Sequence, residues 1–201
     1  DIFSEAIAST SFDRIASNTR ALIKPSIDDE TAERIVDALA SSDSPVLYVG
    51  GGILLAGASE ELEAFADTMQ IPIAHSLMGK GAVRDDHPLV LGMTGFWGTE
   101  LVNQACLSAE TIFAIGTRFK EADCSSWYPG YTFNIPGSKI IHVDIEPSEI
   151  GRNYPTEIGV VADAKAALTV LNRVATKRFP RGRAANPMTA KISEFRKTFA
   201  A

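Results

Sequence analysis

A short apolar strand pattern that runs directly into three glycines constrains this chain more than any other feature. Residues 46–49 are all apolar, and Gly50, Gly51 and Gly52 follow at once. After a short apolar link, a helical pattern begins near Ser59. A strand that leads through glycines into a helix is typical of α/β folds, where it brings backbone amides close to a phosphate or a flat cofactor. The spacing is not G-x-G-x-x-G, so the run is not a dinucleotide-binding fingerprint by itself.

Strand-like and helical patterns alternate regularly along the chain. The expected strands are 46–49, 71–74, 111–115, 139–143 and 159–161. The expected helices are one that starts near Asp28 and ends before Pro45, then 60–69, 99–107 and 164–175. The run 89–91 is either a further strand or a buried loop. Apolar strands that alternate with helices predict an α/β fold with a doubly wound, mainly parallel, Rossmann-like sheet.

The pattern divides the chain into three parts. Residues 1–27 mix Ser, Thr and Asn with apolar positions, and we expect an N-terminal arm or inter-domain linker there. Residues 28–177 carry the regular alternation and form the expected domain. Residues 178–201 begin as a polar linker with Pro and Gly and end in an expected helix at 189–199. Because the chain starts with Asp1 and shows no targeting segment, we expect an internal piece of a longer protein.

The charge and the cysteine content exclude several classes of function. The formal net charge is −6, and only a short run near the C-terminus is locally basic. No apolar run is long enough to cross a bilayer. We therefore expect neither nucleic acid nor a membrane as a partner. Cys106 and Cys124 have neither C-x-x-C nor metal-site spacing, so we expect two reduced thiols in a cytoplasmic protein.

The residues that follow each expected strand form the candidate binding site, because ligands of open parallel sheets bind at the carboxyl ends of the strands. These loops are 50–52, 75–81, 92–98, 116–119, 144–147 and 162–164. Glycine recurs in most of them, and it lets the backbone approach a ligand closely. We therefore expect room for a flat, elongated molecule at this edge of the sheet.

Several of these residues have a structural interpretation beside the functional one. The three glycines serve either a ligand or a tight strand-to-helix turn. Arg118 either holds a phosphate by paired hydrogen bonds or forms an ion pair with a surface acid such as Glu121. Asp144 either accepts from ribose hydroxyls or caps a short helix that starts at Pro147. Asp163 is expected to cap the helix that follows it, a role that is compatible with ligand binding.

The aromatic and histidine residues near the strand ends are also open to two interpretations. Phe96 and Trp97 either stack on a ring or pack within the fold. His75 and His142 are more typical of buried, hydrogen-bonded histidines than of catalytic ones. The sequence contains no P-loop, zinc helix or calcium loop, and no Ser-His-Asp grouping is implied. The candidate site is therefore expected to bind a ligand, with no catalytic residue and no metal ligand.

Taken in order, these loops resemble those of the central domain of thiamine diphosphate-dependent enzymes of the acetolactate synthase group. The resemblance runs from about residue 28 to about residue 176. It rests on P-V-L-Y-V-G-G-G-I at 45–53, M-G-K-G at 78–81, L-G-M-T-G at 91–95, A-I-G-T-R-F at 114–119 and I-H-V-D-I-E-P-S-E-I-G-R at 141–152. The last two motifs together are fairly specific to this group. The resemblance implies a Rossmann-like fold of the DHS-like NAD/FAD-binding type.

The resemblance also implies that the chain is part of a longer enzyme with three α/β domains. In that family, flanking pyrimidine-binding and diphosphate-binding domains of the same chain hold thiamine diphosphate and Mg²⁺, through a glutamate and a G-D-G…N motif respectively. Neither motif occurs here, so this piece alone is expected to bind neither group and to be inactive. The full-length enzyme is expected to be a homodimer or a tetramer.

A nucleotide slot in this domain is a further implication of the resemblance, since family members hold FAD, ADP or nothing there. The positions that correspond to the FAD-contacting loops are Gly50, Gly51, Gly52, Ser76, Leu77, Met78, Thr94, Gly95, Phe96, Trp97, Gly116, Thr117, Arg118, Asp144, Ile145, Ala162 and Asp163. The FAD-binding synthases read G-M-H-G and R-F-D-D-R where this chain reads G-F-W-G at 95–98 and R-F-K-E-A at 118–122. This chain therefore lacks the second arginine and the aspartate of the flavin-binding pattern.

Two functions follow from these observations. The first is the central, non-catalytic domain of a thiamine diphosphate-dependent carboligase or decarboxylase of a 2-keto acid, that is, a transferase or lyase. The alternative is a stand-alone nucleotide-binding module that uses the same sheet edge. A third interpretation is an NAD-dependent deacylase or dehydrogenase with an unusual fingerprint. The dehydrogenase is disfavoured, because residues 60–65 lack the glycine that lets a dinucleotide approach the first helix.

Overall fold

The structure, a computed structural model, describes residues 23–199 and the side chains of residues 23–194. The strands are β1 (Pro45–Val49), β2 (Ile73–His75), β3 (Val90–Met93), β4 (Thr111–Ile115), β5 (Lys139–Asp144) and β6 (Ile158–Val161). The helices are α2 (Asp29–Ser41), α3 (Gly52–Ala56), α4 (Ser59–Met69), α5 (Glu100–Leu107), α6 (Ala164–Arg178) and α7 (Pro187–Phe199). Short 3-10 turns follow four strands, at Leu77–Gly79, Gly95–Trp97, Glu121–Trp127 and Pro147–Glu149.

The six strands of the described residues run parallel in one sheet with the order β3-β2-β1-β4-β5-β6. The chain builds outward from β1 to β3, then returns to the other side of β1 and builds outward again to β6. β1 and β4 pair from Pro45 with Thr111 to Val49 with Ile115. The prediction of a doubly wound, Rossmann-like α/β fold is confirmed, and the strand order reverses between β1 and β4.

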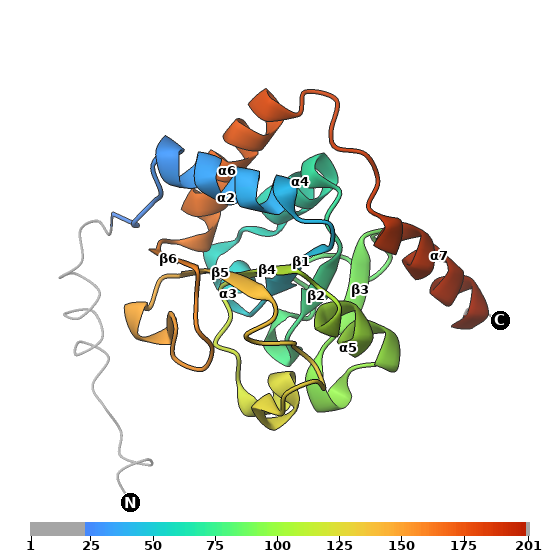
Figure 1. The fold of residues 1–201 in the computed structure, drawn as a ribbon. Coiled ribbons are helices and arrows are strands. Elements are labelled where there is room, and N and C mark those ends of the chain that lie inside the picture. The colour runs from blue at the N-terminus through green and yellow to red at the C-terminus, as the bar shows by residue number, and fades with distance from the viewer. Residues whose placement is uncertain (1–22, 200–201) are drawn as a thin grey trace, which may run out of the picture.

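Helices cover the sheet on both faces (Figure 1). Leu47 and Val49 of β1 pack in one core with apolar residues of α2, α4 and α6. Val46 and Tyr48 pack in a second core, with residues of α5 and of the segment that follows β4. This division reflects the period of two along a strand. A strand that is buried on both faces needs the continuous apolar run that the sequence shows at 46–49.

Carboxylate caps mark where two of the covering helices begin. Asp28 accepts a hydrogen bond from the amide of Thr31 at 2.7 Å, at the start of α2. Asp163 accepts one from the amide of Ala166 at 3.1 Å, at the start of α6. Each carboxylate satisfies an amide that has no partner within the helix and lies at the positive end of the helix dipole. The predicted cap at Asp163 is confirmed.

The structure differs from the expected elements in several places. The apolar link after the glycines is a short helix, α3, which ends where Gly57 adopts a φ of +62°. The strand expected at 71–74 begins later, at Ile73, and extends to His75. The run at 89–91 contributes to a strand, β3, which starts at Val90 and continues to Met93. For the two strands the apolar pattern located a largely buried element, whereas its ends depend on pairing with neighbours that lie far away in the sequence.

Both described ends of the chain pack on this domain. Ile27 is buried in the first core, and the carbonyl of Pro25 accepts a hydrogen bond from the amide of Asp163 at 2.8 Å. Residues 1–22, which make up most of the expected arm, lie outside the described residues. α7, the red helix in Figure 1, packs through Ile192 on the second core. Within residues 23–199, no helix is long and apolar enough to cross a membrane.

Candidate functional site

A cavity of about 460 Å³ lies at the carboxyl edge of the sheet, where the strand order reverses. The loops after β1, β2, β4, β5 and β6 form its walls. The lining residues are Lys24, Gly50, Gly51, Gly52, Leu55, Ala56, Ser76, Met78, Gly116, Thr117, Arg118, Lys120, Asp123, Val143, Asp144, Ile145, Ala162, Asp163 and Ala164. Neighbouring strands lie about 4.8 Å apart, so a cavity that spans five strands suits an elongated ligand.

Most of the predicted ligand-binding residues line this cavity. They are Gly50, Gly51, Gly52, Ser76, Met78, Gly116, Thr117, Arg118, Asp144, Ile145, Ala162 and Asp163. Leu77, Thr94, Gly95, Phe96 and Trp97 do not line it. Four of these five belong to the loop after β3, which is an edge strand. Tertiary structure therefore brings most of the predicted set together, and a ligand contact at each position stays a prediction.

Close packing explains why glycine stands at two positions of the triplet, a question that the sequence left open. A Cβ on Gly50 would lie 2.2 Å from the carbonyl oxygen of Gly116, and a Cβ on Gly52 would lie 2.6 Å from the Cα of Gly116. The backbone after β1 thus touches the backbone after β4, and only glycine fits there. The same close approach leaves backbone, rather than side chains, as the wall of the cavity at its centre.

The loop after β3 is held by hydrogen bonds within the fold and does not line the cavity. Thr94 is fully buried, and its hydroxyl donates to the carbonyl of Asp123 at 2.9 Å. Gly95 exchanges two hydrogen bonds with a buried asparagine side chain of α5. Phe96 and Trp97 are 58% and 65% exposed. The interpretation of these two aromatics as packing residues is therefore wrong, and neither ring lines the cavity.

Asp144 lies at the end of β5 and lines the cavity while its side chain is largely buried. Its Oδ1 accepts a hydrogen bond from the amide of Glu146 at 2.9 Å. The short helix at Pro147 is capped by Glu146, whose carboxylate accepts from the amide of Ser148 at 3.1 Å. The capping interpretation of Asp144 is therefore wrong, and its interaction with a ligand stays a prediction.

Asp163 is held in its ionised form beside the cavity. Its Oδ2 lies 2.9 Å from the Nζ of Lys24. Burial is the largest single effect on its pKa and raises it, but the hydrogen bonds from Lys24 and from the amide of Ala166 together outweigh burial, so the pKa is lowered. The carboxylate thus remains negative at the N-terminus of α6, where the helix dipole also favours it.

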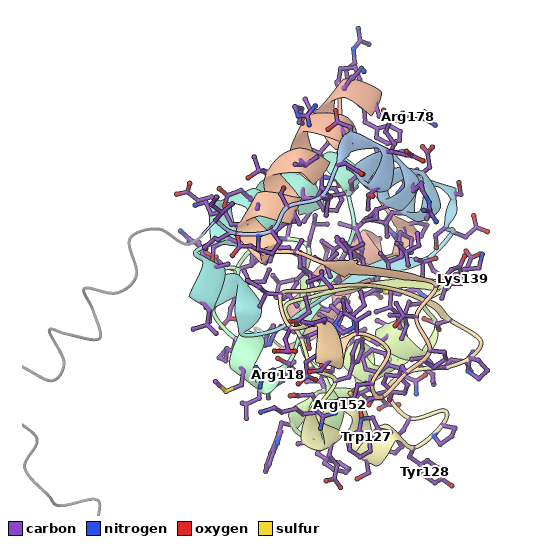
Figure 2. All side chains as sticks on the ribbon, turned by 90° about the vertical axis from the view of Figure 1, so that its left-hand side faces the viewer. Arg118, Trp127, Tyr128, Lys139, Arg152 and Arg178 are labelled. Carbon is purple, nitrogen blue, oxygen red and sulfur yellow. The ribbon has the colours of Figure 1, made fainter. Side chains whose placement is uncertain are left out.

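Arg118 and Lys120, from the loop after β4, bring positive charge to the cavity wall. The Nε of Arg118 lies 3.6 Å from the Oε1 of Glu149, and the Nη1 of Arg152 lies 3.1 Å from the same oxygen. The ion-pair interpretation of Arg118 is therefore confirmed, although the acid beside it is the buried Glu149 and not a surface acid such as Glu121. Figure 2 shows Arg118 and Arg152 close together. The 59% exposure of the Arg118 side chain lets it turn toward a ligand phosphate.

The cavity also contains residues that the sequence did not indicate. They are Lys24, Leu55, Ala56, Lys120, Asp123 and Val143. Val143 adjoins the predicted Asp144, and Leu55 and Ala56 belong to the helix that replaces the expected apolar link. Lys24 comes from the end of the expected arm, and no local pattern connects it with the strand ends.

Neither histidine at the strand ends lines the cavity. The rings of His75 and His142 are buried, and each has a hydrogen bond with a backbone carbonyl, of Ser76 at 3.0 Å and of Thr117 at 2.9 Å. Burial is the main cause that lowers the pKa of both histidines, so both rings are neutral near pH 7. The prediction of buried, hydrogen-bonded histidines is confirmed. The described part of the chain contains no group of three or more His, Cys, Asp or Glu side chains that could hold a metal.

Comparison with known protein families gives a match over residues 32–171, to the family described as "Thiamine pyrophosphate enzyme, central domain". The match contains the whole sheet and every lining residue of the cavity except Lys24.

The chain is also similar to individual curated proteins. A probable acetolactate synthase large subunit from Methanocaldococcus jannaschii is 43% identical over 130 residues, which are 65% of this chain and 21% of that protein. Glyoxylate carboligase from Escherichia coli O157:H7 is 36% identical over 182 residues, which are 90% of this chain and 30% of that protein. Acetolactate synthase from Arthrospira platensis is 36% identical over 133 residues, which are 65% of this chain and 22% of that protein. The chain spans less than a third of the length of each of these relatives.

Proposed function

Because this chain belongs to the thiamine pyrophosphate enzyme family, as a central domain of that family, we propose that it works within a longer thiamine diphosphate-dependent enzyme. The proposed enzyme is a carboligase or decarboxylase of a 2-keto acid, and therefore a transferase or lyase. Similarity to proteins named acetolactate synthase and glyoxylate carboligase supports this proposal. Family membership is the observation that carries this proposal.

Within that enzyme, we propose that this domain binds a nucleotide. The observation that supports this role is the elongated cavity over the point where strand order reverses, which is where open parallel sheets bind nucleotides. The residues of the cavity fit an ADP moiety, which is either ADP itself or the ADP part of FAD. The glycine triplet offers backbone without side chains, Arg118 offers a bidentate donor for a diphosphate, and Asp144 offers an acceptor for ribose hydroxyls.

The catalytic cofactors belong to other parts of the proposed enzyme. Flanking pyrimidine-binding and diphosphate-binding domains of the same chain hold thiamine diphosphate and Mg²⁺, and the enzyme assembles as a homodimer or tetramer. Thiamine diphosphate, when bound there, supplies an electron sink for reactions at a carbonyl carbon. This chain contributes the architecture between those domains and the nucleotide cavity, and by itself it is inactive. We place the enzyme in the cytoplasm, in keeping with the two free cysteines of this chain.

Calorimetric titration of the purified chain with FAD, and with ADP in parallel, tests the nucleotide role. Binding of FAD supports an enzyme that carries a flavin in its central domain. Binding of ADP alone supports a central domain that takes the simpler nucleotide. No heat of binding with either ligand, with the chain shown to be folded by its circular dichroism spectrum, contradicts the nucleotide role.

The parent enzyme tests the catalytic proposal independently of the nucleotide. The parent gene should encode the activating glutamate upstream of this chain and the G-D-G…N motif downstream of it. Full-length protein with thiamine diphosphate, Mg²⁺ and pyruvate or glyoxylate should release CO₂, and the 201-residue chain under the same conditions should release none. A parent gene without either motif favours the stand-alone nucleotide-binding module.

A further inference from the structure

The exposed aromatic side chains of the described residues come from two adjoining segments and lie outside the cavity. They are Phe96, Trp97, Trp127, Tyr128 and Tyr131, which we call the aromatic patch. The turn at 95–97 packs directly on the turn at 121–127, because a Cβ on Gly95 would lie 2.0 Å from the carbonyl oxygen of Ala122. Exposed apolar side chains that gather in this way typically mark an interaction site.

The backbone beside Trp127 is strained, and its ring is held in place. Ser125, Ser126 and Trp127 have φ values of +49°, +56° and +55°, a left-handed conformation that residues other than glycine rarely adopt. The indole Nε1 donates a hydrogen bond to the carbonyl of Phe119 at 2.7 Å. Strain of this kind clusters at functional sites. A ring that is already fixed also loses little entropy when a partner packs on it.

The segments that carry the aromatic patch contain no charged residue. Asp, Glu, Lys and Arg make up 22% of the chain but are absent from residues 88–99 and 124–138. Residues 126–131 are all exposed. The cores of protein interfaces combine aromatic residues with a lack of charged ones. An uncharged surface can also meet a second copy of itself without like-charge repulsion, even though the formal net charge of the chain is −6.

The area of the aromatic patch suits the core of a dimer interface. Phe96 and Trp97 are 58% and 65% exposed, and the other three residues, in chain order, are 40%, 69% and 55% exposed. Because aromatic side chains bury about 150–250 Å² each, these five offer about 400–700 Å². A stable interface buries about 800 Å² of each partner, so the patch supplies about half of this area or more. Figure 2 shows Trp127 and Tyr128 at one end of the molecule, where a second copy can approach.

We propose that the aromatic patch is the contact through which two copies of this chain form a symmetric dimer. In a twofold dimer the same surface of each copy meets itself, so the rings of one copy pack on the uncharged, aromatic surface of the other. Offset and edge-on contacts between such rings are favourable, and Trp and Tyr often dominate the energy of an interface. This dimer does not depend on the nucleotide role, because none of the five side chains lines the cavity.

Sedimentation velocity and tryptophan fluorescence test the dimer on the same samples of the purified chain, over a series of concentrations. The two tryptophans of the chain, Trp97 and Trp127, both belong to the aromatic patch. Their fluorescence therefore reports directly whether the patch is buried. As the concentration rises, the mass should change from that of one chain to that of two. Quenching of the tryptophans by acrylamide should fall over the same range of concentration.

Tyr128→Glu combined with Tyr131→Glu places like charges in the contact between the two copies. This double variant should raise the dissociation constant of the dimer by about tenfold or more. Ile23→Glu is the matched control, because it puts the same charge on an exposed apolar side chain outside the patch, next to the lysine that pairs with Asp163. Its dissociation constant should equal that of the wild-type chain. Circular dichroism establishes that each variant is folded.

Three results would overturn the proposed dimer. A chain that stays monomeric at every concentration has no such contact and leaves the aromatic patch for another part of the parent enzyme. A dimer whose tryptophans stay accessible to acrylamide forms through a different surface. The same conclusion follows from a dimer whose dissociation constant the folded double variant leaves unchanged.

Discussion

The Oδ1 of Asp123 accepts a hydrogen bond from the backbone amide of Leu77 at 2.8 Å, which joins the loop after β4 to the loop after β2. The backbone carbonyl of Asp123 also accepts from the hydroxyl of Thr94, in the loop after β3. One residue for which the sequence indicated no role therefore ties together three loops at the carboxyl edge. The cavity keeps its shape at this end because Asp123 is buried and its bonds are shielded from water.

Asp123→Ala tests this connection. The substitution leaves the amide of Leu77 without its partner and should lower the free energy of unfolding by about 1–3 kcal/mol. Urea denaturation followed by circular dichroism measures the change. Glu33→Ala, at an exposed position of α2, is the control and should change stability by less than about 0.5 kcal/mol. Equal effects of the two substitutions would contradict the role of Asp123.

The close approach of the loops after β1 and β4 predicts a difference between adjacent glycines. The Cβ of Gly50→Ala would lie 2.2 Å from a backbone oxygen of Gly116, which cannot move without displacing β4. We expect a loss of about 1–3 kcal/mol or more from overpacking. Gly51→Ala is the matched control, since its nearest contact is 3.1 Å and its φ is −61°. Thermal melts of the two variants should therefore differ clearly, and equal melting temperatures would argue against backbone contact.

The buried histidines predict how stability depends on pH. In the unfolded chain a histidine takes up a proton near its ordinary pKa of about 6.5, whereas burial lowers the pKa of His75 and His142 in the folded chain. The unfolded state therefore binds more protons below this pH. The stability that these rings contribute is complete above about pH 6.5 and is lost as the pH falls, by up to about 1.4 kcal/mol per pH unit for each histidine.

Urea denaturation at pH 7.5, 6.5 and 5.5 measures this slope. His142→Gln removes one titrating group while its amide can still donate to the carbonyl of Thr117. The variant should lose less stability between pH 6.5 and 5.5 than the wild-type chain does. A slope that the substitution leaves unchanged would assign the pH dependence to other groups.

Cys106 and Cys124 are free thiols, as predicted from the sequence, and both are buried in the structure. Burial raises the pKa of Cys106 to about 12, and burial is also the main cause that raises the pKa of Cys124. Because the thiolate is the reactive form, neither residue should react with a disulfide reagent in the folded chain. A colorimetric assay should detect both thiols in denaturant and almost none in native buffer. Rapid modification of the native protein would show that one of these cysteines becomes exposed.

Arg118→Ala tests whether this side chain holds a phosphate. The substitution should weaken binding of ADP or FAD by about 1–3 kcal/mol, the cost of losing a charged hydrogen bond. The fold should remain intact, since Arg152 still pairs with Glu149. Lys139→Ala is the control, because it removes a positive charge at the start of β5, at the opposite edge of the sheet (Figure 2). Titration calorimetry compares the variants, and unchanged affinity in Arg118→Ala would rule out the phosphate contact.

Most elements of the fold could be predicted from the sequence because their signals are local. The strand at 46–49 needs apolar side chains on both faces, and the cap at Asp163 lies three residues from the amide that it satisfies. The loop motifs at 114–119 and 141–152 also predicted the family, and the match over residues 32–171 confirms it. These features can be recognised in the sequence because each depends on residues that are close neighbours along the chain.

The composition of the cavity depended on tertiary structure. Lys24 lines the cavity because it forms an ion pair with Asp163, which is far away in the sequence. Phe96 and Trp97 do not line it, because their loop packs against the segment after β4. By itself, the sequence determined the α/β class, the order of the elements and the loops that could carry a ligand. Only the packing of those loops decided which side chains face one cavity, because contacts between distant segments have no local pattern along the chain.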